Sequence, residues 1–102
     1  MESVFSAVAD PTRRGILESL RNRGPLSLGQ LADPLPITRQ AVTKHLDILQ
    51  ASGLIRVHRA GRKRLHSLDT GPLQEVEDWL QPYAKEWDQR LLRLKRQLEE
   101  RS

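Results

Sequence analysis

The side chains that could do chemistry in this 102-residue chain are mostly cationic, and they gather in its middle third. Between Pro34 and Leu68 there are seven lysines and arginines and one acid, Asp47, which gives this stretch a net charge of +6. The other 67 residues sum to −2. A positive field confined to one stretch is typical of a face that binds nucleic acid. Composition alone would also allow binding to a membrane surface, or a face that is only solvated. The choice among these interpretations depends on which structural elements carry the cations.

One group of polar residues begins a predicted helix. The pattern indicates a helix from Arg39 to Ala51 with Thr38 as N-cap and with one apolar face of Val42, Leu46 and Leu49. A capping box of Ser27 and Gln30 predicts a short helix just before it, so the pair forms a helix-turn-helix. The second helix of such a pair fits the major groove. Its outward residues are then the candidates for reading base edges: Arg39, Gln40, Thr43 and Lys44.

A second basic group follows on a predicted β-hairpin. Residues 54 to 59 alternate apolar and basic, residues 60 to 63 form a turn, and residues 64 to 68 return. Such a wing would clamp phosphates or enter the minor groove, and would supply affinity more than sequence choice, through Arg56, Arg59, Arg62, Lys63 and Arg64. The alternative is a hairpin made basic only to protect its edge strands. The neighbouring helix-turn-helix favours DNA.

Catalysis and metal binding are not expected. The chain has no cysteine, which excludes disulfides, thiol chemistry and thiolate metal sites. Its histidines, His45, His58 and His66, lack a spacing that would put two of them on one helical face, so structural roles are predicted. There is no glycine-rich phosphate loop or nucleophile elbow. We therefore expect no enzyme, no metal and no cofactor. Without a signal sequence or a long apolar run, the expected compartment is the cytoplasm, with no membrane partner.

The ends of the chain are predicted to be helical. Asp10 is a suitable N-cap for a helix that begins at Pro11 and that Gly24 ends. From about residue 72 to 100 apolar residues recur at steps of three and four, and Pro82 should bend or break this long helix near Gln81. The stripe continues to Leu98, past what one small domain can cover, which predicts a homodimer. An aromatic pocket for a small effector is the rival interpretation.

The predicted fold is thus mainly α with one β-hairpin, an α+β winged helix-turn-helix in the order α-α-α-α-β-β-α. Residues 1–102 form a single domain. The segments ADPTRRGILESL, LSLGQLADPLPITRQAVTKHLDILQASGLI and GRKRLHSLD resemble the ArsR/SmtB-type transcriptional repressors. The resemblance covers almost the whole chain, and AVTKHLDILQASGLI is its most specific part.

This resemblance implies a dimeric DNA-binding regulator whose first and last helices build the interface. That interface would contain Val4, Phe5, Val8, Trp79, Tyr83, Trp87, Leu91, Leu94 and Leu98. It also implies that the DNA-reading helix carries Thr38, Arg39, Gln40, Thr43, Lys44 and His45, with the wing over residues 59–64. For His45 the two arguments differ, because helical spacing places it toward the buried edge, where it would pack or bond the backbone.

Departures from the family pattern concern metals. Many members sense metals through cysteines in the helix that corresponds to residues 26–31, or through histidines on the last helix, and this chain has neither. It is similar to the metal-independent branch. We expect a homodimeric regulator, more a repressor than an activator, on a palindromic operator of double-stranded DNA, with its effector unidentified. A winged-helix protein-interaction module or a small-molecule-responsive regulator is the alternative, and an enzyme comes third.

Overall fold

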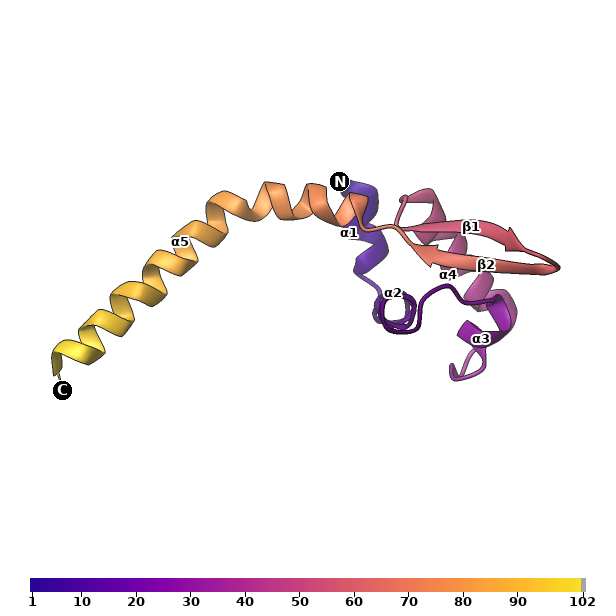
Figure 1. The fold of residues 1–102 in the computed structure, drawn as a ribbon, viewed down its shortest axis with the longest axis horizontal. Helices are drawn as coiled ribbons and strands as arrows, with labels where there is room; N and C mark the ends of the chain where they lie inside the picture. The colour runs from indigo at the N-terminus through magenta and orange to yellow at the C-terminus, as the bar shows by residue number, and fades with distance from the viewer. Residues whose placement is uncertain (102) are drawn as a thin grey trace.

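The computed structural model describes residues 1–101, which form five helices and one two-stranded antiparallel sheet. The elements follow in the order α1 (Glu2–Val8), α2 (Pro11–Arg23), α3 (Leu28–Ala32), α4 (Arg39–Ala51), β1 (Ile55–Ala60), β2 (Lys63–Leu68) and α5 (Gly71–Arg101). The predicted order and winged helix-turn-helix class are confirmed. In Figure 1 the first four helices and the hairpin form one body, and α5 leads away from it.

The helices begin where the sequence predicts. Asp10 caps α2 by accepting from the amide of Arg13 at 2.9 Å. Ser27 and Gln30 form the expected reciprocal capping box of α3. The hydroxyl of Thr38 accepts from the amide of Ala41 at 3.1 Å and caps α4. These caps satisfy amides that the first turn of a helix leaves without partners, so each start is defined locally.

The end of α4 and the hairpin turn each use a glycine with positive φ. The amide of Gly53 (φ 80°) donates to the carbonyl of Gln50, and that of Leu54 to the carbonyl of Leu49, as in a Schellman motif. In the hairpin Ala60 pairs with Lys63, so Gly61 and Arg62 form a two-residue turn. Only Gly61 has positive φ (65°) there, the pattern of a type II′ turn.

His66 ties the hairpin to the segment before α3. Its main chain exchanges hydrogen bonds with Leu26 at 2.8 and 3.0 Å, and its ring Nδ1 lies 3.1 Å from the carbonyl oxygen of Leu26. The side chain is buried. The structural role predicted for this histidine is confirmed.

The core is built by α1 to α4 and the start of β1. Its buried apolar residues are Val4, Ala7, Ile16, Leu20, Leu26, Leu31, Ala32, Val42, Leu46, Leu49, Leu54 and Ile55. Val42, Leu46 and Leu49 all lie in it, as the helical spacing of α4 predicts. Val4 differs from the expectation of an intersubunit position, because its side chain is 4% exposed and packs inside its own chain. Val8 is partly buried against the same core, so Phe5 is the member of that trio that stays exposed.

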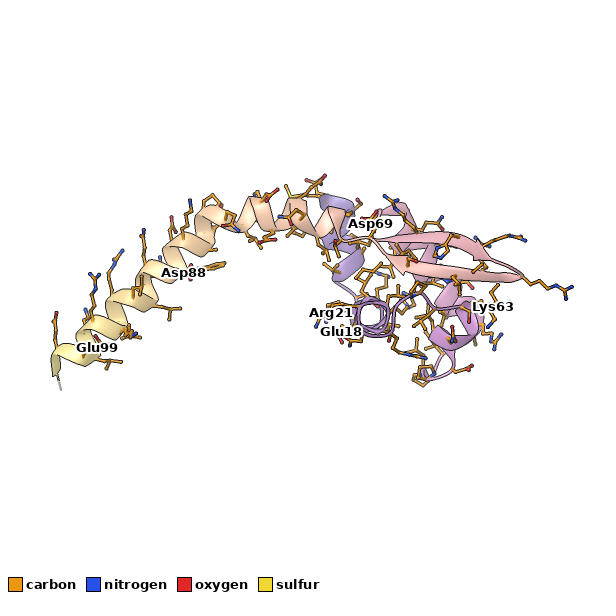
Figure 2. All side chains as sticks on the ribbon, in the orientation of Figure 1. Glu18, Arg21, Lys63, Asp69, Asp88 and Glu99 are labelled. Carbon is orange, nitrogen blue, oxygen red and sulfur yellow. The ribbon has the colours of Figure 1, made fainter. Side chains whose placement is uncertain are left out.

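Helix α5 runs unbroken for 31 residues with Pro82 inside it. A proline removes one amide donor and bends a helix without necessarily ending it, and Figure 1 shows α5 change direction along its length. The radius of gyration is 18.7 Å, against about 13 Å for a compact chain of this size. In Figure 2 Asp88 and Glu99 lie on a part of α5 that no other element approaches. Among the described residues no helix is long and apolar enough to cross a membrane.

Candidate nucleic-acid interface

The predicted reading residues lie on the outer face of α4, opposite the core. Arg39, Gln40, Thr43 and Lys44 are all exposed. The Thr43 hydroxyl donates to the carbonyl oxygen of Arg39 at 2.9 Å, and a guanidinium nitrogen of Arg39 lies 3.8 Å from the carboxylate of Asp33. Gln40 and Lys44 make no hydrogen bond or ion pair with the described part of the chain, so their polar ends are available to a partner.

Thr38 and His45, which the family resemblance adds to this helix, are engaged within the protein. The hydroxyl oxygen of Thr38 accepts the capping hydrogen bond described above. His45 is half-buried on the edge of α4 that faces α2, with Nδ1 3.2 Å from Nη1 of Arg13 and 4.0 Å from the Asp10 carboxylate. The inward placement predicted from helical spacing is therefore observed, although the partners are side chains and not the backbone. Its contact with DNA stays a prediction.

The hairpin carries its cations in two different settings. Arg59, Arg62, Lys63 and Arg64 are exposed, and Lys63 marks in Figure 2 the end of the hairpin furthest from α5. Arg56 lies at the other end, where its Nε donates to Asp69 Oδ2 at 2.8 Å. Asp69 also accepts from the amide of Gly71 at 2.9 Å. Arg56 thus connects the hairpin to the start of α5 and differs from the four cations nearer the turn.

The acids that border the basic stretch reduce its available charge. Asp33 and Asp69 immediately precede and follow the stretch from Pro34 to Leu68, and each lies beside one of its arginines. Within the described residues the cations of this stretch without an ion pair are Lys44, Arg59, Arg62, Lys63 and Arg64. One lies on α4 and four on the hairpin, so the positive surface has two parts.

A cleft of about 310 Å³ separates these two parts. It opens between α4 and the hairpin and is lined by Leu28, Thr43, Leu46, Asp47, Gln50, Val57, Arg64 and His66. Asp47 of α4 and Arg64 of the hairpin contribute opposite charges to it. Helix and hairpin therefore present their cations as separate surfaces, which suits a helix in one groove and a wing on the flanking backbone.

Arg13 and Arg14, to which the sequence alone assigns no role beyond their charge, have a structural role. Arg13 donates through Nε to the carbonyl oxygen of Ala7 at 2.7 Å and through Nη2 to that of Ser6 at 3.1 Å. Arg14 donates through Nη1 to the carbonyl oxygens of Val8 and Ala9 at 2.8 and 3.1 Å. The last carbonyls of a helix need such donors. A short helix that ends two residues before an N-cap, with paired arginines three and four residues after that cap, was the available signal.

Two aspartates at helix starts predict how stability depends on pH. The pKa of Asp10 is lowered by the amide of Arg13 and by its nearby guanidinium, and that of Asp69 by the amide of Gly71 and the hydrogen bond from Arg56. A folded-state pKa below the unfolded value stabilises the fold above the unfolded pKa, about 3.9, and this contribution disappears as the pH falls through the folded value. We expect the urea concentration at the unfolding midpoint to decrease as the pH is lowered below about 4.

Urea titrations of Asp10→Asn and Asp69→Asn against pH check this. Each variant should be less stable than the wild type at pH 7 and should lose less stability on acidification. Asp88→Asn is the control, since Asp88 makes no ion pair or hydrogen bond with the described residues and its replacement should leave the profile unchanged. Parallel profiles for all three variants and the wild type would contradict the assignment.

Comparison with known proteins agrees with this arrangement. Residues 8–58, which contain α2, α3 and α4, match the family model of a helix-turn-helix domain. The transcriptional repressor SdpR of Bacillus subtilis (strain 168) is 35% identical over 88 residues, which cover 86% of this chain and 97% of that protein. An alignment of this length extends beyond the helix-turn-helix into the hairpin and α5.

Solved structures show the same relationship. The ArsR family transcriptional regulator RHA00566 superposes with a TM-score of 0.74 at 38% identity, over 85% of this chain and 89% of that one. An ArsR-like transcriptional regulator from Rhodococcus sp. RHA1 gives 0.73 at 39% identity, over 93% and 89%. These relatives are regulators and not enzymes, which confirms the prediction of a non-enzymatic protein. With its winged helix-turn-helix and these relatives, the chain belongs to the ArsR/SmtB-type family of DNA-binding transcriptional regulators.

Proposed function

We propose that the protein is a homodimeric transcriptional repressor that binds a palindromic operator and does not depend on a metal. The observation that carries the proposal is the set of unpaired cations on two adjacent elements, α4 and the hairpin, within the described residues. Helix α4 enters the major groove, and the hairpin contacts the phosphates beside it. Repression is favoured because the relative SdpR is a repressor, and because a protein that covers a promoter blocks polymerase without further parts. Such a regulator acts at the chromosome, in the cytoplasm.

Dimerisation is supported by an apolar surface that the chain leaves uncovered. Phe5 of α1 lies against Trp79 of α5 with ring centroids 5.8 Å apart, and Trp79 lies 5.6 Å from Tyr83. The stripe continues along α5 through Trp87, Leu91, Leu94 and Leu98, each more than half exposed. A contiguous apolar face of this length is unfavourable in water and marks an association surface. A second copy would cover it.

The charges of α5 favour a two-fold, antiparallel arrangement. Helical spacing places Glu77 and Glu86 beside the stripe in the first half of α5. In the second half Arg90 and Lys95, with one acid, Asp88, lie beside it. A two-fold axis across the helix places the acidic half of one copy beside the basic half of the other, and a parallel pair would oppose like charges. The same axis would present two copies of α4 on one side of the dimer, where they could enter successive major grooves. This geometry requires a palindromic operator.

Independence from metal is proposed from the ligands available. The chain lacks cysteine, and its last histidine is His66, before α5 begins. Among the described residues no group of three or more His, Asp or Glu side chains is arranged to hold a metal ion. We therefore expect a chelator to leave operator affinity unchanged.

Replacing the reading residues should change which sequences are preferred. Gln40 can pair with adenine through two hydrogen bonds, and Lys44 can donate to guanine. For Gln40→Ala and Lys44→Ala we expect a loss of about 1 to 3 kcal/mol against the preferred operator, and less against operators altered at the contacted base pair. Titration of each variant with a panel of single-base operator variants measures this. Equal losses of affinity on every duplex would show that these side chains contact the DNA backbone and not the bases.

The proposal as a whole is tested by selecting genomic DNA fragments with the purified protein near physiological salt, with and without a chelator. A palindromic site enriched in both cases is the expected result. Enrichment that disappears with the chelator would overturn the metal-independent part. No enriched sequence in either case would overturn the proposal in favour of a winged-helix module that binds another protein.

A further inference from the structure

Arg13 connects three helices through one guanidinium. Besides the carbonyl oxygens of Ser6 and Ala7 at the end of α1, it reaches Nδ1 of His45 on α4 at 3.2 Å. Its own amide donates to Asp10 at the start of α2. Arg13 is half-buried, so water competes with these bonds only in part. A residue at the beginning of α2 thus links the end of α1 to the edge of the DNA-reading helix.

The contact with Arg13 favours one tautomer of His45. A guanidinium has only N–H donors and stays charged, so a hydrogen bond from Nη1 requires Nδ1 of His45 to be an unprotonated acceptor. The neutral imidazole then carries its hydrogen on Nε2. Within the described part of the chain Nε2 has no hydrogen-bond partner, and the side chain keeps 22% of its surface exposed. In the form that the contact with Arg13 favours, Nε2–H is therefore a free donor.

We infer that Arg13 is a positioning residue for DNA binding: it orients His45 so that Nε2–H donates to a phosphate oxygen, and it holds α4 at a set angle to α1. This inference rests on the proposed function, because the acceptor is the DNA backbone. Phosphate oxygens accept such donors in protein–DNA complexes, and these contacts fix the register of the reading helix. Since α1 carries Phe5 at the end of the proposed dimer surface, Arg13 also links that surface to α4.

Arg14 provides a matched control for this role. It lies on the same helix, has the same charge and bonds the last carbonyls of α1, yet it makes no hydrogen bond with α4 among the described residues. If capping of α1 were all that mattered, Arg13→Gln and Arg14→Gln would have similar effects. If Arg13 acts through His45, only Arg13→Gln should behave like a loss of His45.

The first measurement is the tautomer of His45 in the DNA-free protein, read from ring 15N chemical shifts near pH 7.5. We expect Nε2–H in the wild type and in Arg14→Gln, and a mixture of tautomers in Arg13→Gln. Arg13→Lys retains the charge without the forked geometry, so it should also give a mixture and serves if Arg13→Gln does not fold. A single unchanged tautomer in both Arg13 variants would overturn the inference.

The second measurement is a double-mutant cycle on the operator selected by the wild type. Arg13→Gln and His45→Ala should each lower affinity about tenfold, and the double variant should also lose about tenfold instead of about a hundredfold. Arg14→Gln should stay within about twofold. Additive losses would overturn a role through His45. A wild type that binds no duplex would overturn the proposed function, while the tautomer measurement would still decide whether Arg13 positions His45.

Discussion

Leu94→Glu is expected to turn the protein into a monomer and to weaken operator binding by about a hundredfold or more. The side chain of Leu94 lies on the exposed apolar stripe of α5, where the proposed interface would bury it. A carboxylate buried there without a partner carries a large desolvation cost, incurred twice across a two-fold axis. A monomer engages one half-site and loses the effective concentration that links two sites, a factor of about 10² to 10⁴. Analytical ultracentrifugation and operator titration measure both effects.

Leu92→Glu is the matched control for this result. Leu92 is about as exposed as Leu94 (56% against 52%), but helical spacing turns it away from the stripe. The Leu92→Glu substitution introduces the same charge into the same part of α5, and we expect this variant to be a dimer with wild-type affinity for the operator. If both variants remain dimeric, the interface lies elsewhere on the molecule. If both become monomeric, the interface includes more than the stripe.

The double variant Arg62→Ala/Lys63→Ala should weaken binding to every duplex about a hundredfold near 0.15 M salt, with little change in sequence preference. Both side chains lie at the hairpin turn, exposed and without an ion pair among the described residues. Phosphate binding acts through counterion release, so removing one cation from the DNA backbone makes the slope of log affinity against log salt shallower by about 0.9. For the four side chains of a dimer the change is about three to four.

The control removes the same charge elsewhere. Arg93 and Arg96 are exposed on α5, on the side of the helix opposite the apolar stripe. If net charge alone drew the protein to DNA, Arg93→Ala/Arg96→Ala would flatten the salt slope as much as the hairpin variant. We expect an almost unchanged slope. A loss limited to certain sequences in the hairpin variant would show instead that the wing reads bases.

The distribution of charge along the chain predicts the basic surface on α4 and the hairpin correctly, because both elements follow from periodicity. It does not separate Arg56 from the other hairpin cations, because the partner of Arg56 is Asp69, 13 residues away across the sheet. The ion pair between Asp33 and Arg39, across the turn before α4, is likewise not predicted by the distribution of charge along the chain. Whether a cation is available depends on its neighbours in space.

Burial at the N-terminus shows the same limit. Val4, Phe5 and Val8 follow one helical spacing, and the family resemblance places all three in the dimer interface. The structure places Val4 in the core, Val8 at its margin and Phe5 against Trp79. A helical period identifies residues that share a face, but it does not say which of them faces the chain's own core and which a partner.

Local sequence signals predict the order of the elements, the starts of α2, α3 and α4, the end of α4 and the turn of the hairpin. Each depends on hydrogen bonds or backbone angles within a few residues, such as Ser27 with Gln30 or Gly61 in its turn. No local signal predicts that Arg13 joins α1 to His45, because this contact is between residues 32 positions apart. Such contacts depend on how packed helices cross, and that geometry follows from the whole core and not from the spacing of residues in any one segment.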